Sequence, residues 1–155
     1  MSRILFSVLA LAGIAACADD PPGFVLFKAS ELKGMQQQLA RKLTPQKTAT
    51  QQLNNFGTHS VMMAHMEASG VAEIHETVTD IFIIQSGEAS ITVGGKVVDA
   101  KSTAPGEVRG TSIQGGVTKK VGAGDVVNIP VGTPHHTQVA PGQQVTYLVV
   151  KVRAK

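Results

Sequence analysis

Large aromatic side chains are almost absent from this 155-residue chain, which contains no tryptophan and a single tyrosine, Tyr147. A ligand pocket would therefore be lined by aliphatic, Met and Phe side chains rather than by an aromatic platform. Long basic runs are also absent: the longest clusters are Lys119-Lys120 and the tail from Lys151, and the formal net charge is only +3. This charge distribution argues against nucleic-acid binding.

The N-terminus has the features of an export signal. A basic residue is followed by an apolar run, residues 4–16, which is too short to span a membrane and leads into small residues around Cys17. Residues 14–17 fit a bacterial lipobox, whereas residues 16–18 also fit the small-x-small pattern that releases a free protein. We therefore expect a signal peptide at residues 1–18 and a periplasmic or extracellular protein. The sequence leaves open whether Cys17 anchors it to a membrane through a lipid.

The length and the 43% hydrophobic content are those of one domain. Residues 19–57 are expected to form a Pro-rich linker, an edge strand at Phe24–Phe27, and an amphipathic helix from an N-cap at Ser30 to about Lys42. Residues 58–155 contain short apolar runs separated by Gly and Pro, which predicts an all-β sandwich or barrel. The expected strands are Ser60–Met66, Ile81–Gln85, Ala89–Val93, Val126–Ile129 and Val145–Val152.

Two motifs carry most of the functional information. The downstream motif has the spacing Gly-x5-Pro-x-Gly-x2-His, formed by Gly124, Pro130, Gly132 and His135. An Asn four residues after the histidine would complete it, and Val139 stands there instead. Such punctuation is typical of short strands joined by tight turns.

The upstream motif follows the pattern Gly-x5-His-x-His-x3–4-Glu-x6-Gly in part. His75 takes the second histidine position, Asp80 the glutamate position and Gly87 the closing glycine. Glu73 replaces the first histidine, and Gly70 is the nearest upstream glycine. The two motifs resemble those of the cupin superfamily, in particular its small, single-domain exported members with a cupin-2 type barrel.

This resemblance implies a cupin-type double-stranded β-helix, that is, a jelly-roll barrel, here with a short N-terminal helix. By analogy with cupin barrels that pair through edge strands, a homodimer through Phe24–Phe27 is expected.

Strand geometry and the resemblance together predict a metal site. Residues two apart in a strand share a face, so Glu73 and His75 point the same way. With Asp80 facing inward and His135 entering from the second motif, two imidazoles and two carboxylates would meet inside the barrel. The resemblance implies that Glu73, His75, Asp80 and His135 bind one divalent ion, and this donor set is compatible with Mn, Fe, Ni or Zn. The alternative is a metal-free barrel in which Glu73 holds a buried imidazole by a hydrogen bond.

Neighbouring polar residues are expected to lie outside this ligand set. Strand alternation directs His136 away from His135, and Glu76 away from His75. His65 could line the pocket, but a place in the core or at the rim is favoured.

The connection between the motifs is longer than compact cupins have, and the extra length lies at residues 94–116. Long connections within compact domains are often functional. It could fold over the barrel mouth as a lid, with Glu107 and Arg109 facing the pocket, or it could be an exposed hairpin held by salt bridges.

Two functional classes remain open. The first is a metal-dependent enzyme acting on a small oxygenated molecule as a dioxygenase, isomerase, decarboxylase or lyase. Its ion would act as a Lewis acid, and Glu107 or Glu73 would be the catalytic group that moves protons. The second is a non-catalytic module that binds or senses a small ligand, since one fold can serve both.

Overall fold

A computed structural model describes residues 19–154 of the chain. The expected signal peptide and the proposed lipid anchor at Cys17 lie outside these residues. The described part contains one α-helix and strands β1 to β12, so the all-β prediction is confirmed. No helix among residues 19–154 is long and apolar enough to cross a membrane.

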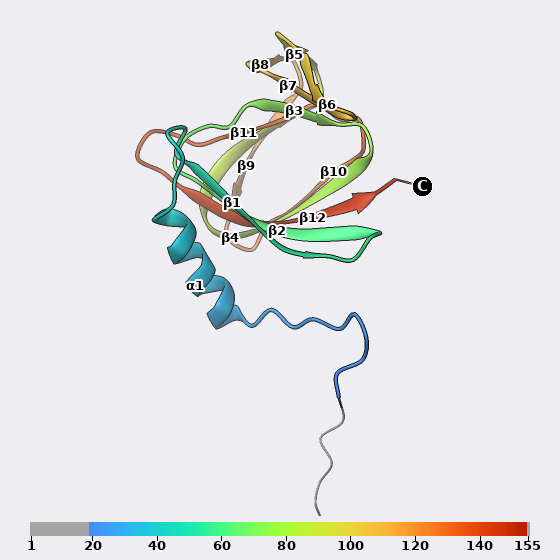
Figure 1. The fold of residues 1–155 in the computed structure, drawn as a ribbon. Helices are drawn as coiled ribbons and strands as arrows, with labels where there is room; N and C mark the ends of the chain where they lie inside the picture. Colours follow the sequence, from blue (N-terminus) through green and yellow to red (C-terminus); the bar gives the residue numbers. More distant parts are fainter. Residues whose placement is uncertain (1–18, 155) are drawn as a thin grey trace, which may run out of the picture.

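Ten strands form one curled sheet, and the other two form a small separate sheet. The strands are β1 (Thr48–Asn55), β2 (His59–Met66), β3 (Ala72–His75), β4 (Val78–Val93), β5 (Lys96–Val98), β6 (Lys101–Ala104), β7 (Glu107–Gly110), β8 (Ser112–Gln114), β9 (Val117–Gly122), β10 (Val126–Ile129), β11 (His135–Gln138) and β12 (Val145–Arg153). The large sheet has the order β1-β2-β12-β4-β11-β3-β7-β6, and β9 and β10 also pair with β4. All pairings are antiparallel, and Figure 1 shows that the sheet is strongly curled.

The long strand β4 combines two strands that the sequence predicted separately, Ile81–Gln85 and Ala89–Val93. It continues through Gly87, which has φ 73°. A Cβ atom at this position would lie 1.9 Å from the carbonyl oxygen of Gln144, so only glycine fits. The first half of β4 pairs with β12 and β10, and the second half pairs with β9 and β11.

The helix α1 (Ala29–Ala40) lies against the outside of the barrel (Figure 1). Its N-cap is Lys28, so the predicted cap at Ser30 is wrong. The Glu31 carboxylate accepts a hydrogen bond from the Lys28 backbone N–H (3.2 Å), which stabilises a helix start two residues before the predicted one. Leu39 packs against Ala49 and Met63 on the outer face of the sheet.

The predicted edge strand at Phe24–Phe27 is also wrong. These residues form no strand, because their backbone is paired with no neighbouring strand. Phe24 and Leu26 are 56% and 61% exposed, so apolar composition alone misled the prediction. A homodimer through this segment stays a prediction.

Strand alternation fills the barrel interior with apolar side chains. In β4, Phe82 and Ile84 point inward, and in β12, Val145, Tyr147 and Val149 do the same. The opposite faces of β2 and β12 carry Met63 and Leu148 toward α1. The interior therefore has an apolar wall, on which the polar site is built.

Residues 94–116 form a projection that we call the arm. Val93 and Val117 are direct partners in the β4–β9 pair, so the arm leaves and re-enters the sheet at a single point. Strands β5 and β8 pair as its neck, while β6 and β7 form a hairpin whose second strand joins the main sheet beside β3 (Figure 1). The arm is thus a hairpin that extends the sheet at the barrel mouth.

Candidate metal centre

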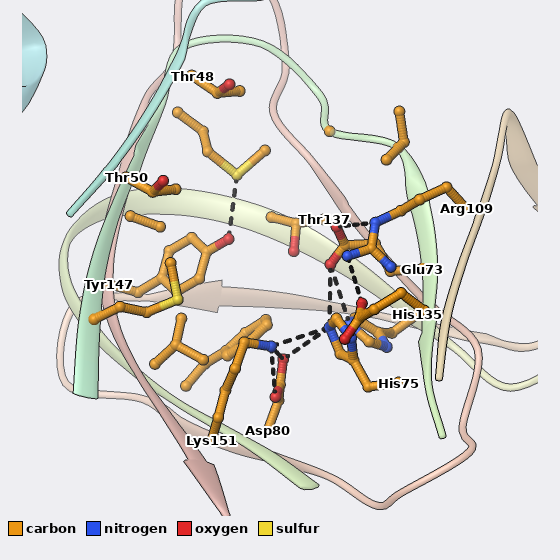
Figure 2. Close-up of a pocket in the computed structure, with 18 of the residues that line it drawn as sticks. Thr48, Thr50, Glu73, His75, Asp80, Arg109, His135, Thr137, Tyr147 and Lys151 are labelled. Carbon is orange, nitrogen blue, oxygen red and sulfur yellow. Dashed lines mark hydrogen bonds and ion pairs between the residues drawn. The ribbon is translucent and has the colours of Figure 1, made fainter. Parts of the chain in front are cut away.

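A cavity of about 690 Å³ lies inside the barrel, with one apolar and one polar wall (Figure 2). The apolar wall includes Met62, Ala64, Met66, Phe82 and Val149. The polar wall includes Glu73, His75, Asp80, Glu107, Arg109, His135 and Lys151. The four predicted metal ligands and the two arm residues therefore face the same cavity.

Glu73, His75 and His135 form the closest group of potential ligands. Strands β3 and β11 bring them together, since His135 and Glu73 are direct partners across the two strands. Glu73 Oε2 lies 3.5 Å from His75 Nε2 and 3.6 Å from His135 Nε2, and the three ligand atoms all lie within 4.8 Å of one another. Neighbouring ligands of a tetrahedral ion with 2.1 Å bonds are about 3.4 Å apart. A first-row divalent ion fits this spacing.

The orientation of the His135 ring leaves one nitrogen free. Nδ1–H donates to the carbonyl oxygen of Thr133 at 3.0 Å. Nε2 is buried and has no hydrogen-bond partner. A buried polar atom without a partner is unfavourable, whereas a metal bond would satisfy it. His135, the histidine that the downstream motif predicted, therefore has a nitrogen free to bind a metal ion.

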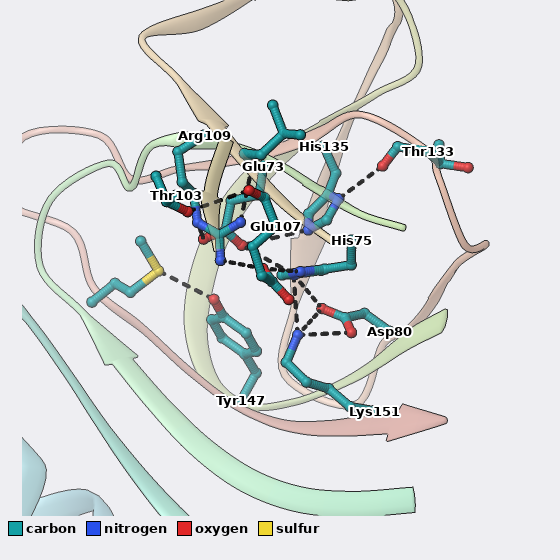
Figure 3. Close-up of polar contacts among 12 residues, drawn as sticks. Glu73, His75, Asp80, Thr103, Glu107, Arg109, Thr133, His135, Tyr147 and Lys151 are labelled. Atoms are coloured by element: carbon teal, nitrogen blue, oxygen red, sulfur yellow. Dashed lines mark hydrogen bonds and ion pairs between the residues drawn. The ribbon is translucent and has the colours of Figure 1, made fainter. Parts of the chain in front are cut away.

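The arm contributes two residues that hold the trio in place (Figure 3). Glu107 Oε2 lies 2.7 Å from His75 Nδ1, which leaves Nε2 directed into the cavity. Arg109 forms ion pairs with both glutamates: its Nη2 lies 2.7 Å from Glu107 Oε2, and its Nε lies 3.1 Å from Glu73 Oε1. A carboxylate on the far nitrogen of a ligating histidine is a common way of orienting the ring and raising its basicity. The arm thus combines features of both predicted forms: Glu107 and Arg109 face the pocket, and the segment is a hairpin with salt bridges.

Lys151 places a cation at the edge of the trio. It extends from β12, and its Nζ lies 2.9 and 2.8 Å from the two carboxylate oxygens of Asp80. The same Nζ is 3.1 Å from His75 Nε2. Asp80 was predicted as a ligand, and here both of its oxygens contact Lys151. The sequence interpretation missed Lys151, although alternation from Tyr147 through Val149 places it on the inward face.

The charges around the trio shift its pKa values. Burial would lower the pKa of His75, but hydrogen bonds with Asp80 and Glu73 outweigh burial and raise it to about 9. Burial would raise the pKa of Glu73, but contacts with His135, His75 and Arg109 hold it well below its usual range. The pKa of Asp80 is also lowered, against burial, by His75 and Lys151. The carboxylates are therefore ionised at neutral pH.

The remaining predicted positions lie away from the trio. Glu76 is exposed. His136 points to the opposite side of β11 from His135, yet it is buried and its Nε2 lies 2.9 Å from the carbonyl oxygen of Gly70. His65 is buried outside the cavity and contacts Thr146 Oγ1 at 2.7 Å.

Comparison with solved structures identifies the fold. A double-stranded β-helix protein from Klebsiella pneumoniae matches with TM-score 0.54 and 14% identity over 74% of this chain and 86% of that one. The cupin domain of Cnp3 from Schizosaccharomyces pombe matches with TM-score 0.53 and 12% identity over 70% and 66%. The chain therefore has the cupin-type double-stranded β-helix fold, with one short helix.

Enzymes also occur among the similar structures. A DMSP lyase from Ruegeria pomeroyi matches with TM-score 0.51 and 20% identity over 70% of this chain, and an oxalate oxidase in complex with glycolate with TM-score 0.51 and 18% identity over 71%. The aligned part spans about half of each of these longer chains, 48% and 53%. No family model matches the chain, and no curated protein matches it.

Proposed function

We propose that the protein binds one divalent metal ion through Glu73, His75 and His135, and that the loaded barrel acts on a small oxygenated molecule held in the cavity. The observation that carries the proposal is the buried Nε2 of His135, which has no hydrogen-bond partner and lies beside Glu73. Mn, Fe, Ni and Zn all suit two imidazoles and a carboxylate. Two similar structures are enzymes named for oxalate and DMSP, which supports a small-molecule substrate.

The residues around the trio have distinct tasks in this proposal. A divalent ion bound there supplies Lewis-acid polarisation of a substrate oxygen. Glu73, which is ionised well below neutral pH, suits ligation better than proton transfer. Glu107 holds the His75 ring and also faces the cavity, so it remains the candidate for accepting a proton from a substrate. Arg109 offsets the charge of both glutamates.

The second candidate is a metal-free barrel that binds or senses a small ligand. Lys151 favours it, because the ammonium group already offsets the charge of Asp80 and lies 3.1 Å from His75 Nε2. In this case the apolar wall around Met62 and Val149 would supply most of the ligand contact.

Metal content separates the two candidates. The protein, purified without a chelating tag, is analysed for bound metal beside the His75→Ala/His135→Ala double variant. We expect about one divalent ion per chain in the parent and a loss of that ion in the variant. No ion in the parent after incubation with Mn, Fe, Ni or Zn would reject the metal site and leave the binding module.

Export is a further part of the proposal and rests on residues 1–18. Fractionation of the producing cell tests it, and a protein found only in the cytoplasm would reject it. Cys17→Ser removes the residue that would carry the lipid. If the protein is lipid-anchored, this change should release it from the membrane fraction, whereas the location of a free protein should not change.

A further inference from the structure

We propose that Lys151 is an internal competitor for the metal site: its ammonium group occupies the His75–Asp80 side of the cavity and must swing out when an ion binds. This inference rests on the proposed metal-binding function. It adds Lys151 as a residue that sets the affinity of the site for a metal ion and its preference for ions of a given charge.

Lys151 and a bound ion would compete for the same atom, Nε2 of His75. Lys151 Nζ lies 3.1 Å from His75 Nε2, on the side of the ring that faces Asp80 (Figure 3). In the neutral ring, with Nδ1–H donating to Glu107, Nε2 carries the one lone pair, and that lone pair cannot accept a hydrogen bond from Lys151 and bind an ion at the same time. Two positive charges on the same side of a partly buried cavity also repel each other, and the double charge of a divalent ion strengthens that repulsion. One of them must leave.

Lys151 has a route by which to leave. Its side chain is 25% exposed, whereas that of Asp80 is 3% exposed. The four-carbon stem of lysine is flexible, and its head group is readily hydrated. Asp80 lies on a buried strand position in β4 and cannot follow. Movement of Lys151 toward solvent is therefore the simplest way to open the site.

The exchange also explains why Asp80 lies beside the trio without joining it. A carboxylate buried to this degree requires a cation as partner. In the structure that partner is Lys151, which contacts both oxygens at 2.8 and 2.9 Å. After Lys151 leaves, an ion at His75 is the replacement, because Asp80 Oδ2 is only 3.3 Å from His75 Nε2. Asp80 would then contact the ion, as the sequence motif predicted.

Zn²⁺ titration against a competing chelator tests the inference. Lys151→Met keeps the length of the side chain and removes its charge, and Lys119→Met, on an exposed position of β9, is the matched control. We expect Lys151→Met to bind Zn²⁺ at least about tenfold more tightly than the parent, and Lys119→Met to bind like the parent. Equal affinity of Lys151→Met and the parent would overturn this inference and leave the proposed function intact.

A second measurement uses the unmodified protein, in case Lys151→Met fails to fold around an unpartnered Asp80. An amine-reactive label is added with and without Zn²⁺, and labelled lysines are quantified by mass spectrometry. We expect Zn²⁺ to increase labelling of Lys151 several-fold and to leave Lys119 unchanged. Bound Zn²⁺ with unchanged Lys151 labelling would overturn the inference. If the parent binds none of Zn²⁺, Mn²⁺, Fe²⁺ and Ni²⁺, the proposed function is overturned with it.

Discussion

Replacing Glu107 with Gln tests whether the arm controls metal binding from outside the ligand trio. Gln has nearly the same shape, and its amide oxygen can still accept one hydrogen bond from His75 Nδ1. The change removes the negative charge 2.7 Å from that nitrogen and one of the two ion pairs of Arg109. His75 becomes a less basic ligand, and the orientation of its ring is held less firmly.

Glu107→Gln should weaken metal binding. Removing the partner that orients a ligating histidine typically weakens metal binding about 10- to 100-fold, or about 1.4–2.7 kcal/mol. Glu107 should fall in this range, because its contact with His75 is short and is reinforced by Arg109. Zn²⁺ or Mn²⁺ titration against a competing chelator, at fixed pH and salt concentration, measures the change.

Glu76→Gln is the matched control. It removes the same charge one residue from His75, but from an exposed side chain that does not line the cavity. We expect its affinity to stay within about twofold of the parent, because exposed charges are screened. Parent-like binding by Glu107→Gln, or an equal loss in both variants, would refute the orienting role of Glu107.

Two predictions concern stability rather than metal affinity. With a chelator present, so that no metal is bound, the pKa of His75 is about 9 in the folded protein and about 6.5 in the unfolded chain. The contribution of His75 to the free energy of unfolding, on the order of 3 kcal/mol, should therefore be complete below pH 6.5 and be lost as the pH rises toward 9. Urea unfolding at several pH values in that range measures this loss, and the free energy of unfolding of His75→Gln should depend less on pH than that of the parent. A parent free energy of unfolding that is constant from pH 6.5 to 9 would contradict the pKa assignment. Gly87→Ala should destabilise the barrel by more than about 2 kcal/mol, because the new Cβ meets the backbone of Gln144 at a positive φ. Gly34→Ala, in α1 with no atom within 4 Å of the new Cβ, should instead stabilise by up to about 1 kcal/mol, and similar effects of the two changes would refute the strain argument.

The parts that the sequence predicted well depend on local pattern. Alternation correctly placed Glu73 and His75 on one face, and the short apolar runs separated by Gly and Pro correctly indicated many short strands after residue 58. These features need no knowledge of distant residues.

The parts that it missed depend on pairing between distant segments. Phe24–Phe27 has the composition of a strand but no partner, which no local pattern reveals. Lys151 looked like part of a basic tail, because its contact with Asp80 joins residues far apart in the chain. One of the two predicted forms of the arm turned Glu107 toward the pocket, but the pairing of β7 with β3, which brings Glu107 to His75, was invisible in the order of residues.

The arm leaves and re-enters the β4–β9 pair at one place in the chain and also pairs with β3 through β7, and this arrangement separates two properties of the site. Val93 and Val117 already face each other across the β4–β9 hairpin, so residues 94–116 take the place of a turn. The barrel alone supplies Glu73, His75 and His135, while the arm supplies Glu107 and Arg109. Changes in the length or tip sequence of the arm can thus alter ligand basicity and cavity charge without rebuilding the barrel. The ability to coordinate an ion and the tuning of that ability are, in this architecture, free to diverge separately.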